Sequence, residues 1–278
     1  MANIIRFGGG AGGGAGGGNK ASASLTPKSG VTYTDGLSGI EPAILSLMSA
    51  IISNNSDITS ETTTVYVDIV YGNIHRKINV GDQVTIALNG TNYAFDVIGF
   101  NHDTLTTSTA YGATTKTGKA GITFQMHDMS ATTYVMNSSN TNSGGWKSSA
   151  MRTSTMATMK GYMPAAWQTA IKPVNKVSGT GGGSSSGTET VSDSCFLLAE
   201  IEIFGYTTYS VSGEGTQYAY YKAGNSKVKN KGGSADLWWE RSPYRLTSYS
   251  FCIVDEDGHA ATLRASNDIA GVAFGFCV

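Results

Sequence analysis

The first regular apolar pattern in the chain predicts a helix over residues 40–52. Six apolar residues recur there at the spacing of one helical face: Ile40, Ile44, Leu47, Met48, Ile51 and Ile52. Ser38 and Glu41 resemble a capping box, and Pro42 falls in the first turn, where proline is tolerated. Because a short amphipathic helix must cover its apolar face, we expect it either to pack on the following domain or to pair with copies of itself.

Beyond residue 60 the pattern changes to the alternation and the β-branched runs that are typical of strands. Residues 64–71 are β-branched and aromatic, and apolar and polar residues alternate over 84–88. Asn89-Gly90 is a strong turn signal, so it predicts a hairpin whose second strand includes residues 93–97. The same criteria predict further strands at residues 121–126, 196–204, 249–254 and 273–278.

The middle of the chain is expected to contain short helices and a long loop. Residues 144–170 predict two helices that are broken at Met163-Pro164, since proline cannot continue a helix. Their methionines are expected to fill the core rather than to form a binding surface. The Gly- and Ser-rich segment 178–192 is expected to be a loop. In the strand predicted next, Glu200 and Glu202 would share one face.

The glycine-rich segment 8–18, GGGAGGGAGGG, cannot form a hydrophobic core of its own. It is either a flexible tether or an ordered attachment arm, because glycine allows close backbone approach in extended helices. In the second case Ile4, Ile5 and Phe7 would form an apolar anchor that inserts into a partner protein. In both interpretations, residues 1–30 are an N-terminal arm that connects the chain to a larger assembly.

Composition and charge narrow the classes of function. The chain has 278 residues, with 19 Lys+Arg against 20 Asp+Glu, which excludes nucleic-acid binding driven by phosphate neutralisation. Its apolar runs fall short of the roughly 20 residues that span a bilayer, and no secretory signal is evident. A neutral composition rich in Gly, Ser and Thr without an export signal suggests a component of a virus particle. The three cysteines, Cys195, Cys252 and Cys277, are expected to be small buried hydrophobes.

Motifs for catalysis or cofactor binding are missing from the sequence. The four histidines lie far apart, and no nucleophile elbow, phosphate-binding loop or zinc spacing occurs. The repeated dipeptides His102-Asp103 and His127-Asp128 are expected to be polar loop residues, with a metal or acid–base site as the alternative. Asp255–Gly258 is expected to be a charged hairpin tip rather than a calcium loop. We therefore expect no enzyme, no cofactor and no metal.

A resemblance to a known family rests on the C-terminal half. Trp238–Pro243 reads WWERSP and is followed by Phe251–Val254 and by Gly271-Val272. Upstream, Ser143–Arg152 contains a GGW motif before a predicted helix. Together these motifs resemble a domain of unknown function that is common in gut bacteria and their phages, and the resemblance covers roughly residues 80–278.

The resemblance implies a C-type-lectin-like fold, shared with formylglycine-generating enzymes and with variable receptor-binding proteins of phages. Two departures stand out: Glu240 replaces the family's usual leucine, and Ala273–Gly275 replaces its Arg-Pro-Ala. The calcium-binding tripeptides of sugar-binding lectins are also absent, so the fold alone does not imply calcium-dependent sugar binding.

The expected architecture is α+β. It consists of a Gly-rich attachment arm (1–30), a helix with a β linker region (31–79) and a C-type-lectin-like domain (80–278). Tyrosine and arginine are well suited to binding surfaces. The candidate surface residues are accordingly Trp239, Arg241, Tyr244, Arg245, Tyr249, Tyr218 and Tyr220.

These expectations predict a phage virion protein of the tail-fibre, tail-tip or head-fibre type. Its arm would bind other virion proteins, and its C-terminal domain would bind a glycan or protein on a bacterial surface. Because single weak sites gain from multivalency, we expect a homo-oligomer such as a trimer. The alternatives are a purely structural capsid-decoration or tail-assembly protein, and an adhesin at the bacterial cell surface. No nucleic acid and no membrane insertion is expected.

Overall fold

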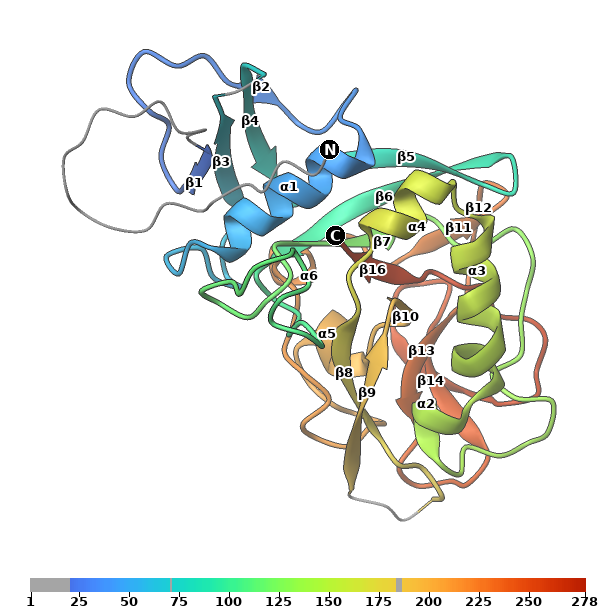
Figure 1. The fold of residues 1–278 in the computed structure, drawn as a ribbon. Coiled ribbons are helices and arrows are strands. Elements are labelled where there is room, and N and C mark those ends of the chain that lie inside the picture. Colours follow the sequence, from blue (N-terminus) through green and yellow to red (C-terminus); the bar gives the residue numbers. More distant parts are fainter. Residues whose placement is uncertain (1–20, 71, 184–186) are drawn as a thin grey trace.

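The computed structural model describes residues 21–70, 72–183 and 187–278, in a mixed α and β architecture with several small sheets (Figure 1). The coarse α+β prediction is therefore confirmed. A small N-terminal sheet lies at one end of the molecule, and a larger body of sheets and helices extends away from it (Figure 1). The N-terminal arm predicted at residues 1–30, with its anchor Ile4, Ile5 and Phe7, lies for the most part outside the described residues.

The N-terminal sheet has the strand order β1-β3-β4-β2 among the described residues. Its strands are β1 (Ala21–Ser24), β2 (Thr34–Asp35), β3 (Thr64–Ile69) and β4 (Ile74–Asn79). The alternating Val65, Val67 and Ile69 of β3 are buried, as the strand pattern predicts. Strand β1, which starts at the first described residue, pairs antiparallel with β3.

Helix α1 (Pro42–Ser53) packs on β1 and β3 and also on helix α4 (Ala165–Ala170). The structure thus realises the predicted packing of this helix on its own chain. The predicted capping box is wrong: Glu41, not Ser38, is the residue before the helix, and it makes no side-chain cap. The reason is Pro42, which forces the preceding Glu41 into an extended conformation with ψ 148°.

The largest sheet in the described part of the chain has the order β10-β16-β7-β6-β5, with antiparallel neighbours throughout. Its strands are β5 (Gln83–Leu88), β6 (Thr91–Phe100), β7 (Ile122–Met126), β10 (Cys195–Phe196) and β16 (Gly275–Cys277). Asn89 and Gly90 both have positive φ, which confirms the predicted hairpin turn. At the centre of the core, the Phe276 ring packs against the rings of Phe95 and Phe124.

The helical region follows the prediction closely. Helix α2 (Gly145–Ser148) and a π-helical turn at Met151–Thr155 lead into α3 (Met156–Tyr162), and α4 starts after Pro164. The break at Met163-Pro164 is thereby confirmed. Met151, Met156 and Met159 are buried, in agreement with their expected role as core residues.

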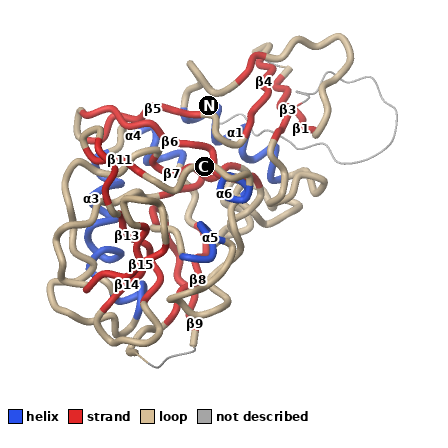
Figure 2. Tube along the Cα trace, turned by 180° about the vertical axis from the view of Figure 1, so that it is seen from behind, coloured by secondary structure: helices blue, strands red, loops and turns tan. Residues whose placement is uncertain are grey.

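The remaining strands form three smaller antiparallel sheets in the C-terminal body (Figure 2). These strands are β8 (Val174–Gly179), β9 (Thr188–Asp193), β11 (Lys229–Lys231), β12 (Ser234–Asp236), β13 (Trp238–Pro243), β14 (Ser250–Val254) and β15 (Ala260–Arg264). The loop predicted over residues 178–192 is therefore wrong at both ends, because β8 and β9 pair there as a hairpin. Their polar side chains hid the alternation that normally marks a strand.

The strand predicted over residues 196–204 is also wrong. Only β10 at its start is extended, and helix α5 (Glu200–Phe204) follows, with Gly205 in the left-handed conformation that ends it. Another short helix, α6 (Ala219–Lys222), packs against α5. The alternation of acidic and apolar residues suggested a strand, but Glu200 and Glu202 are both buried and accept hydrogen bonds inside the protein.

Candidate functional site

Strand β13 contributes the two tryptophans, and both are fully buried. The Trp239 indole donates to the Tyr134 carbonyl at 2.5 Å, and the Trp238 indole donates to the Lys227 carbonyl at 3.0 Å. We had expected Trp239 to lie at the surface, since neighbours in a strand point to opposite faces. That prediction is wrong because elements cover both faces of β13, among them α2, α5 and β8.

Arg241 of the same strand is also fully buried, so it is not a surface residue. Its guanidinium forms a bidentate ion pair with Glu202, at 2.5 and 2.9 Å, and donates to the carbonyls of Val177, Leu197 and Glu214. Burial by itself would lower the pKa of Arg241, but the Glu202 carboxylate raises it above its usual value. Arg241 therefore stays positively charged. It links its own strand β13 to β8, to residues 197–202 and to the loop at Glu214.

A second buried cation, Lys176 of β8, lies beside the Arg241–Glu202 pair. We call Arg241, Glu202, Lys176 and Asp103 the ionic network. Its ammonium contacts the carboxylates of Asp103 at 2.7 Å and Glu202 at 2.8 Å. The Tyr218 hydroxyl donates to Asp103 at 2.9 Å, and the Tyr218 ring stacks on His102. Burial would raise the pKa of Asp103, yet Lys176 and His102 hold it well below its usual value. Tyr218 is thus a core residue and not the surface residue that we expected.

Three corrections follow for residues in or near this network. Asp103, predicted as a polar loop residue, is a buried partner of Lys176. Tyr220 is only 8% exposed, so it adds little to any surface. Lys176 was missed because a lysine among polar residues normally faces solvent. The cysteine prediction, in contrast, is confirmed: all three cysteines are buried and free.

Buried carboxylates extend from the ionic network to the surface loops. Glu200 accepts hydrogen bonds from the backbone amides of Thr208, Tyr209 and Ser210. Glu214 accepts from the Gly179 amide at 2.7 Å and from the Ser242 hydroxyl at 2.6 Å. The backbone amides of the loop that carries Tyr209 are therefore bonded to the buried Glu200 carboxylate rather than to solvent.

The loops at the end remote from the N-terminal sheet carry the predicted residues that are exposed. Figure 1 shows the β8–β9 hairpin pointing toward that end. We define the distal loop cluster as Tyr209, Tyr244, Arg245, Leu246 and Tyr249. Leu246 is 60% exposed and Tyr249 is 41% exposed, while the rings of Tyr209 and Tyr244 meet edge to face at 5.6 Å. Three of the predicted surface residues, Tyr244, Arg245 and Tyr249, thus come together here.

A single buried amide, Asn142, holds the distal loop cluster in shape. Its side-chain nitrogen donates to the carbonyls of Tyr244 at 3.1 Å, Thr247 at 2.8 Å and Ser250 at 2.7 Å. Its side-chain oxygen accepts from the Gly182 amide at the tip of the β8–β9 hairpin. Sequence reasoning missed Asn142, because an asparagine in a polar run gives no sign that several segments converge on it.

The chemistry of the distal loop cluster suits binding rather than catalysis. It offers rigid tyrosine rings, an exposed apolar side chain and the Arg245 guanidinium, with Arg264 placed 5.3 Å from the centre of the Tyr249 ring. Within residues 21–70, 72–183 and 187–278, no group of three or more His, Cys, Asp or Glu residues could hold a metal ion. In the same ranges, no helix combines the length and apolar character needed to cross a bilayer.

Comparison with protein families places the C-terminal body in a known group. Residues 120–278 match the family model described as "Domain of unknown function (DUF6273)", which is more than half of the 278 residues. The match includes β13 and every residue of the distal loop cluster. Neither the comparison with curated proteins nor that with solved structures gave a match.

Proposed function

The chain belongs to this family, DUF6273, and we propose that it is a structural protein of a phage virion that binds the host cell surface. The N-terminal arm attaches to other virion proteins, and the C-terminal body presents the distal loop cluster to a bacterial surface glycan or protein. One observation carries this proposal. Exposed and half-buried tyrosines, an exposed arginine and an exposed leucine lie together on loops that a buried polar network holds in place, at the end remote from the N-terminal sheet.

Rigid loops matter because ordering a mobile loop on binding costs affinity. Glu200 fixes the backbone around Tyr209, and Asn142 fixes the backbone around Tyr244 and Ser250. The backbone of these loops is thus held in place before any ligand arrives. This arrangement resembles the use of a fixed scaffold to display variable loops.

We also propose that the C-terminal body has a C-type-lectin-like fold. A mixed architecture with small antiparallel sheets, long ordered loops and a buried WWERSP strand supports it. We propose binding without calcium, because the lectin calcium tripeptides are absent from the sequence. The anchor residues Ile4, Ile5 and Phe7 remain the proposed contact with the particle, and a homo-oligomer such as a trimer remains the proposed assembly.

A cell-binding assay with purified protein tests the proposal. We expect Tyr249→Ala to weaken adsorption to host cells by at least about tenfold, since tyrosine is enriched among the residues that dominate binding energy, and Leu246→Ala to weaken it less. Leu25→Ala is the matched control, because Leu25 is also an exposed leucine (47%) but follows strand β1 in the N-terminal sheet. If both cluster variants adsorb like the control, the chain is a purely structural virion protein instead.

A further inference from the structure

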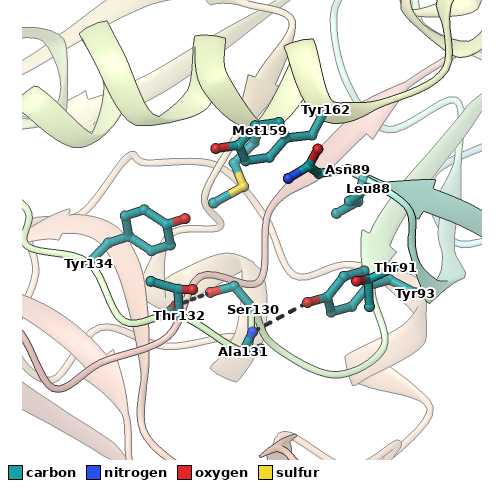
Figure 3. A pocket seen from close by; sticks show the side chains of 10 residues that line it. All are labelled: Leu88, Asn89, Thr91, Tyr93, Ser130, Ala131, Thr132, Tyr134, Met159 and Tyr162. Carbon is teal, nitrogen blue, oxygen red and sulfur yellow. Dashed lines mark hydrogen bonds between the residues drawn. The ribbon is translucent and has the colours of Figure 1, made fainter.

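A pocket in the C-terminal body is lined by three tyrosines that the sequence did not single out. We call it the tyrosine pocket; its volume is about 250 Å³. Figure 3 shows the hydroxyls of Tyr93 and Tyr134 pointing toward each other from opposite sides, with Tyr162 and Asn89 above them. The lining residues are Leu88, Asn89, Thr91, Tyr93, Ser130, Ala131, Thr132, Tyr134, Met159 and Tyr162.

Regular elements and fixed loops build the walls of this pocket. The β5–β6 turn is joined to the end of α3 by a hydrogen bond from the backbone amide of Asn89 to the Tyr162 carbonyl, at 3.0 Å. On the opposite side, the Ser130 hydroxyl accepts from the Val272 amide and donates to the Thr132 carbonyl. The Tyr134 carbonyl accepts from the buried Trp239 indole. The pocket is therefore formed before a ligand enters it.

The electrostatic character of the pocket is neutral. None of the described residues that line it is charged. Burial raises the pKa of the Tyr134 hydroxyl above its ordinary value, and the hydroxyls of Tyr162 and Tyr93 raise it further. Tyr134 consequently keeps its proton at neutral pH, so the pocket presents phenol groups and an amide but no full charge.

We propose that the tyrosine pocket binds one ring of a neutral saccharide. A charged ligand would lose its hydration without meeting an opposite charge, and a purely apolar ligand would displace water from the tyrosine hydroxyls without offering them a hydrogen bond. A sugar ring has an apolar face for the tyrosine rings and hydroxyls at its edge for the phenol groups and Asn89. The volume is below the roughly 300–1,000 Å³ of pockets for drug-sized ligands, which suits a single ring.

This site goes beyond the proposed function and does not depend on it. The tyrosine pocket and the distal loop cluster share no residue. A saccharide in the pocket is recognised by shape and neutral hydrogen bonds, whereas the distal loop cluster includes the exposed guanidinium of Arg245. The pocket therefore defines a ligand class by itself, whether or not the chain is part of a virion.

Saturation-transfer NMR with the full chain and a panel of monosaccharides tests this inference. We expect neutral hexoses and N-acetylhexosamines to bind with a dissociation constant on the order of 1 mM, as small ligands of this size do. Hexuronic acids and hexosamines should bind at least about tenfold more weakly, because their charge finds no partner. Tyr162→Ala should abolish the signal, and Tyr162→Phe should reduce it, since the ring stays and the hydroxyl is lost.

Tyr206→Ala serves as the matched control, because Tyr206 is also exposed (57%) and does not line the pocket. Tyr162 is itself 40% exposed, so its loss should leave the fold intact, which circular dichroism of the variant verifies. The inference is overturned if no neutral sugar gives a signal, if charged sugars bind equally well, or if Tyr162→Ala binds like wild type.

Discussion

At the scale of single residues, the core of this protein contains an unusual acid. Glu240 of β13 is fully buried, and neither of its carboxyl oxygens has a hydrogen-bond partner among the described residues. Burial raises the pKa of Glu240 well above its usual value, and the nearby Glu200 and Glu214 raise it further. The fold therefore favours the neutral form of this side chain, whereas the unfolded chain ionises it at neutral pH.

Replacing this acid should stabilise the protein. Because the folded pKa lies above the unfolded value of 4.5, stability is lost as the pH rises above that value. We expect Glu240→Leu to raise the free energy of unfolding by about 1–3 kcal/mol near neutral pH. The gain should shrink toward about pH 4, where the unfolded chain also protonates glutamate.

Urea unfolding at several pH values measures this effect. Glu256→Leu is the control, because Glu256 is exposed in the β14–β15 turn. A gain from Glu240→Leu that does not change with pH would show that Glu240 is not held neutral by the fold.

In contrast to the loss of Glu240, the loss of Lys176 should destabilise the protein. Lys176→Met leaves the buried carboxylates of Asp103 and Glu202 with one cation fewer. Removing one partner of a buried ion pair costs about 3–5 kcal/mol, so we expect a loss of unfolding free energy of that size in urea titrations. The exposed Lys116→Met should change stability by less than about 0.5 kcal/mol. Equal effects of the two variants would contradict the ionic network.

At the scale of elements, the sequence predicted those structures whose signals act on the local backbone. The hairpin at Asn89-Gly90 and the helix break at Pro164 were predictable because turn geometry and proline act through the local backbone. The hairpin β8–β9 and helix α5 were not, because distant partners hold them. Glu200 and Glu202, for example, receive their hydrogen bonds from loops and from Arg241, and no local pattern encodes these contacts.

The candidate site was predictable only in part, for the same reason. Tyr244, Arg245 and Tyr249 are exposed or half-buried as expected, whereas Trp239 and Arg241 are covered by other elements. Aromatic and arginine side chains favour both interfaces and cores, so residue type alone does not separate the two environments. Only the packing of helices and strands against β13 decides between them.

The Asn142 side chain links two elements by hydrogen bonds, the β8–β9 hairpin and the β13–β14 loop. Asn142→Ala removes all its side-chain hydrogen bonds, so we expect a loss of about 1–3 kcal/mol in unfolding free energy. Amide hydrogen exchange in residues 244–249 should rise with it. Asn142→Asp keeps the acceptor for Gly182 but loses the donors, so an intermediate effect is expected. Unchanged exchange in both variants would contradict the role of Asn142.

At the scale of the whole molecule, α1 joins the N-terminal sheet to the C-terminal body. A methyl group at Gly121, directly before β7, would overlap the backbone carbonyl of Ser49 in this helix. We therefore expect Gly121→Ala to destabilise the protein by about 1–3 kcal/mol in thermal or urea unfolding. The control Gly161→Ala lies in α3 with open space around it and should be neutral or slightly stabilising. Similar stabilities would show that α1 is not closely packed on the sheet.

The same arrangement suggests a division of labour along the chain. Strand β1 begins at Ala21 and pairs within the N-terminal sheet, so a chain that starts there retains all the described pairing of this sheet. Residues 8–18 before it are glycine and alanine only, a composition that cannot form a hydrophobic core of its own. Attachment and surface binding should therefore be separable by a single truncation.

The most direct measurement of this division is the amount of the chain in purified phage particles, determined by quantitative mass spectrometry. A chain lacking residues 1–20 should fold, bind host cells in purified form and yet be missing from the particles. The full-length chain with Tyr249→Ala should show the reverse: normal incorporation and weak binding. Incorporation of the truncated chain at the level of the full-length protein would contradict the account.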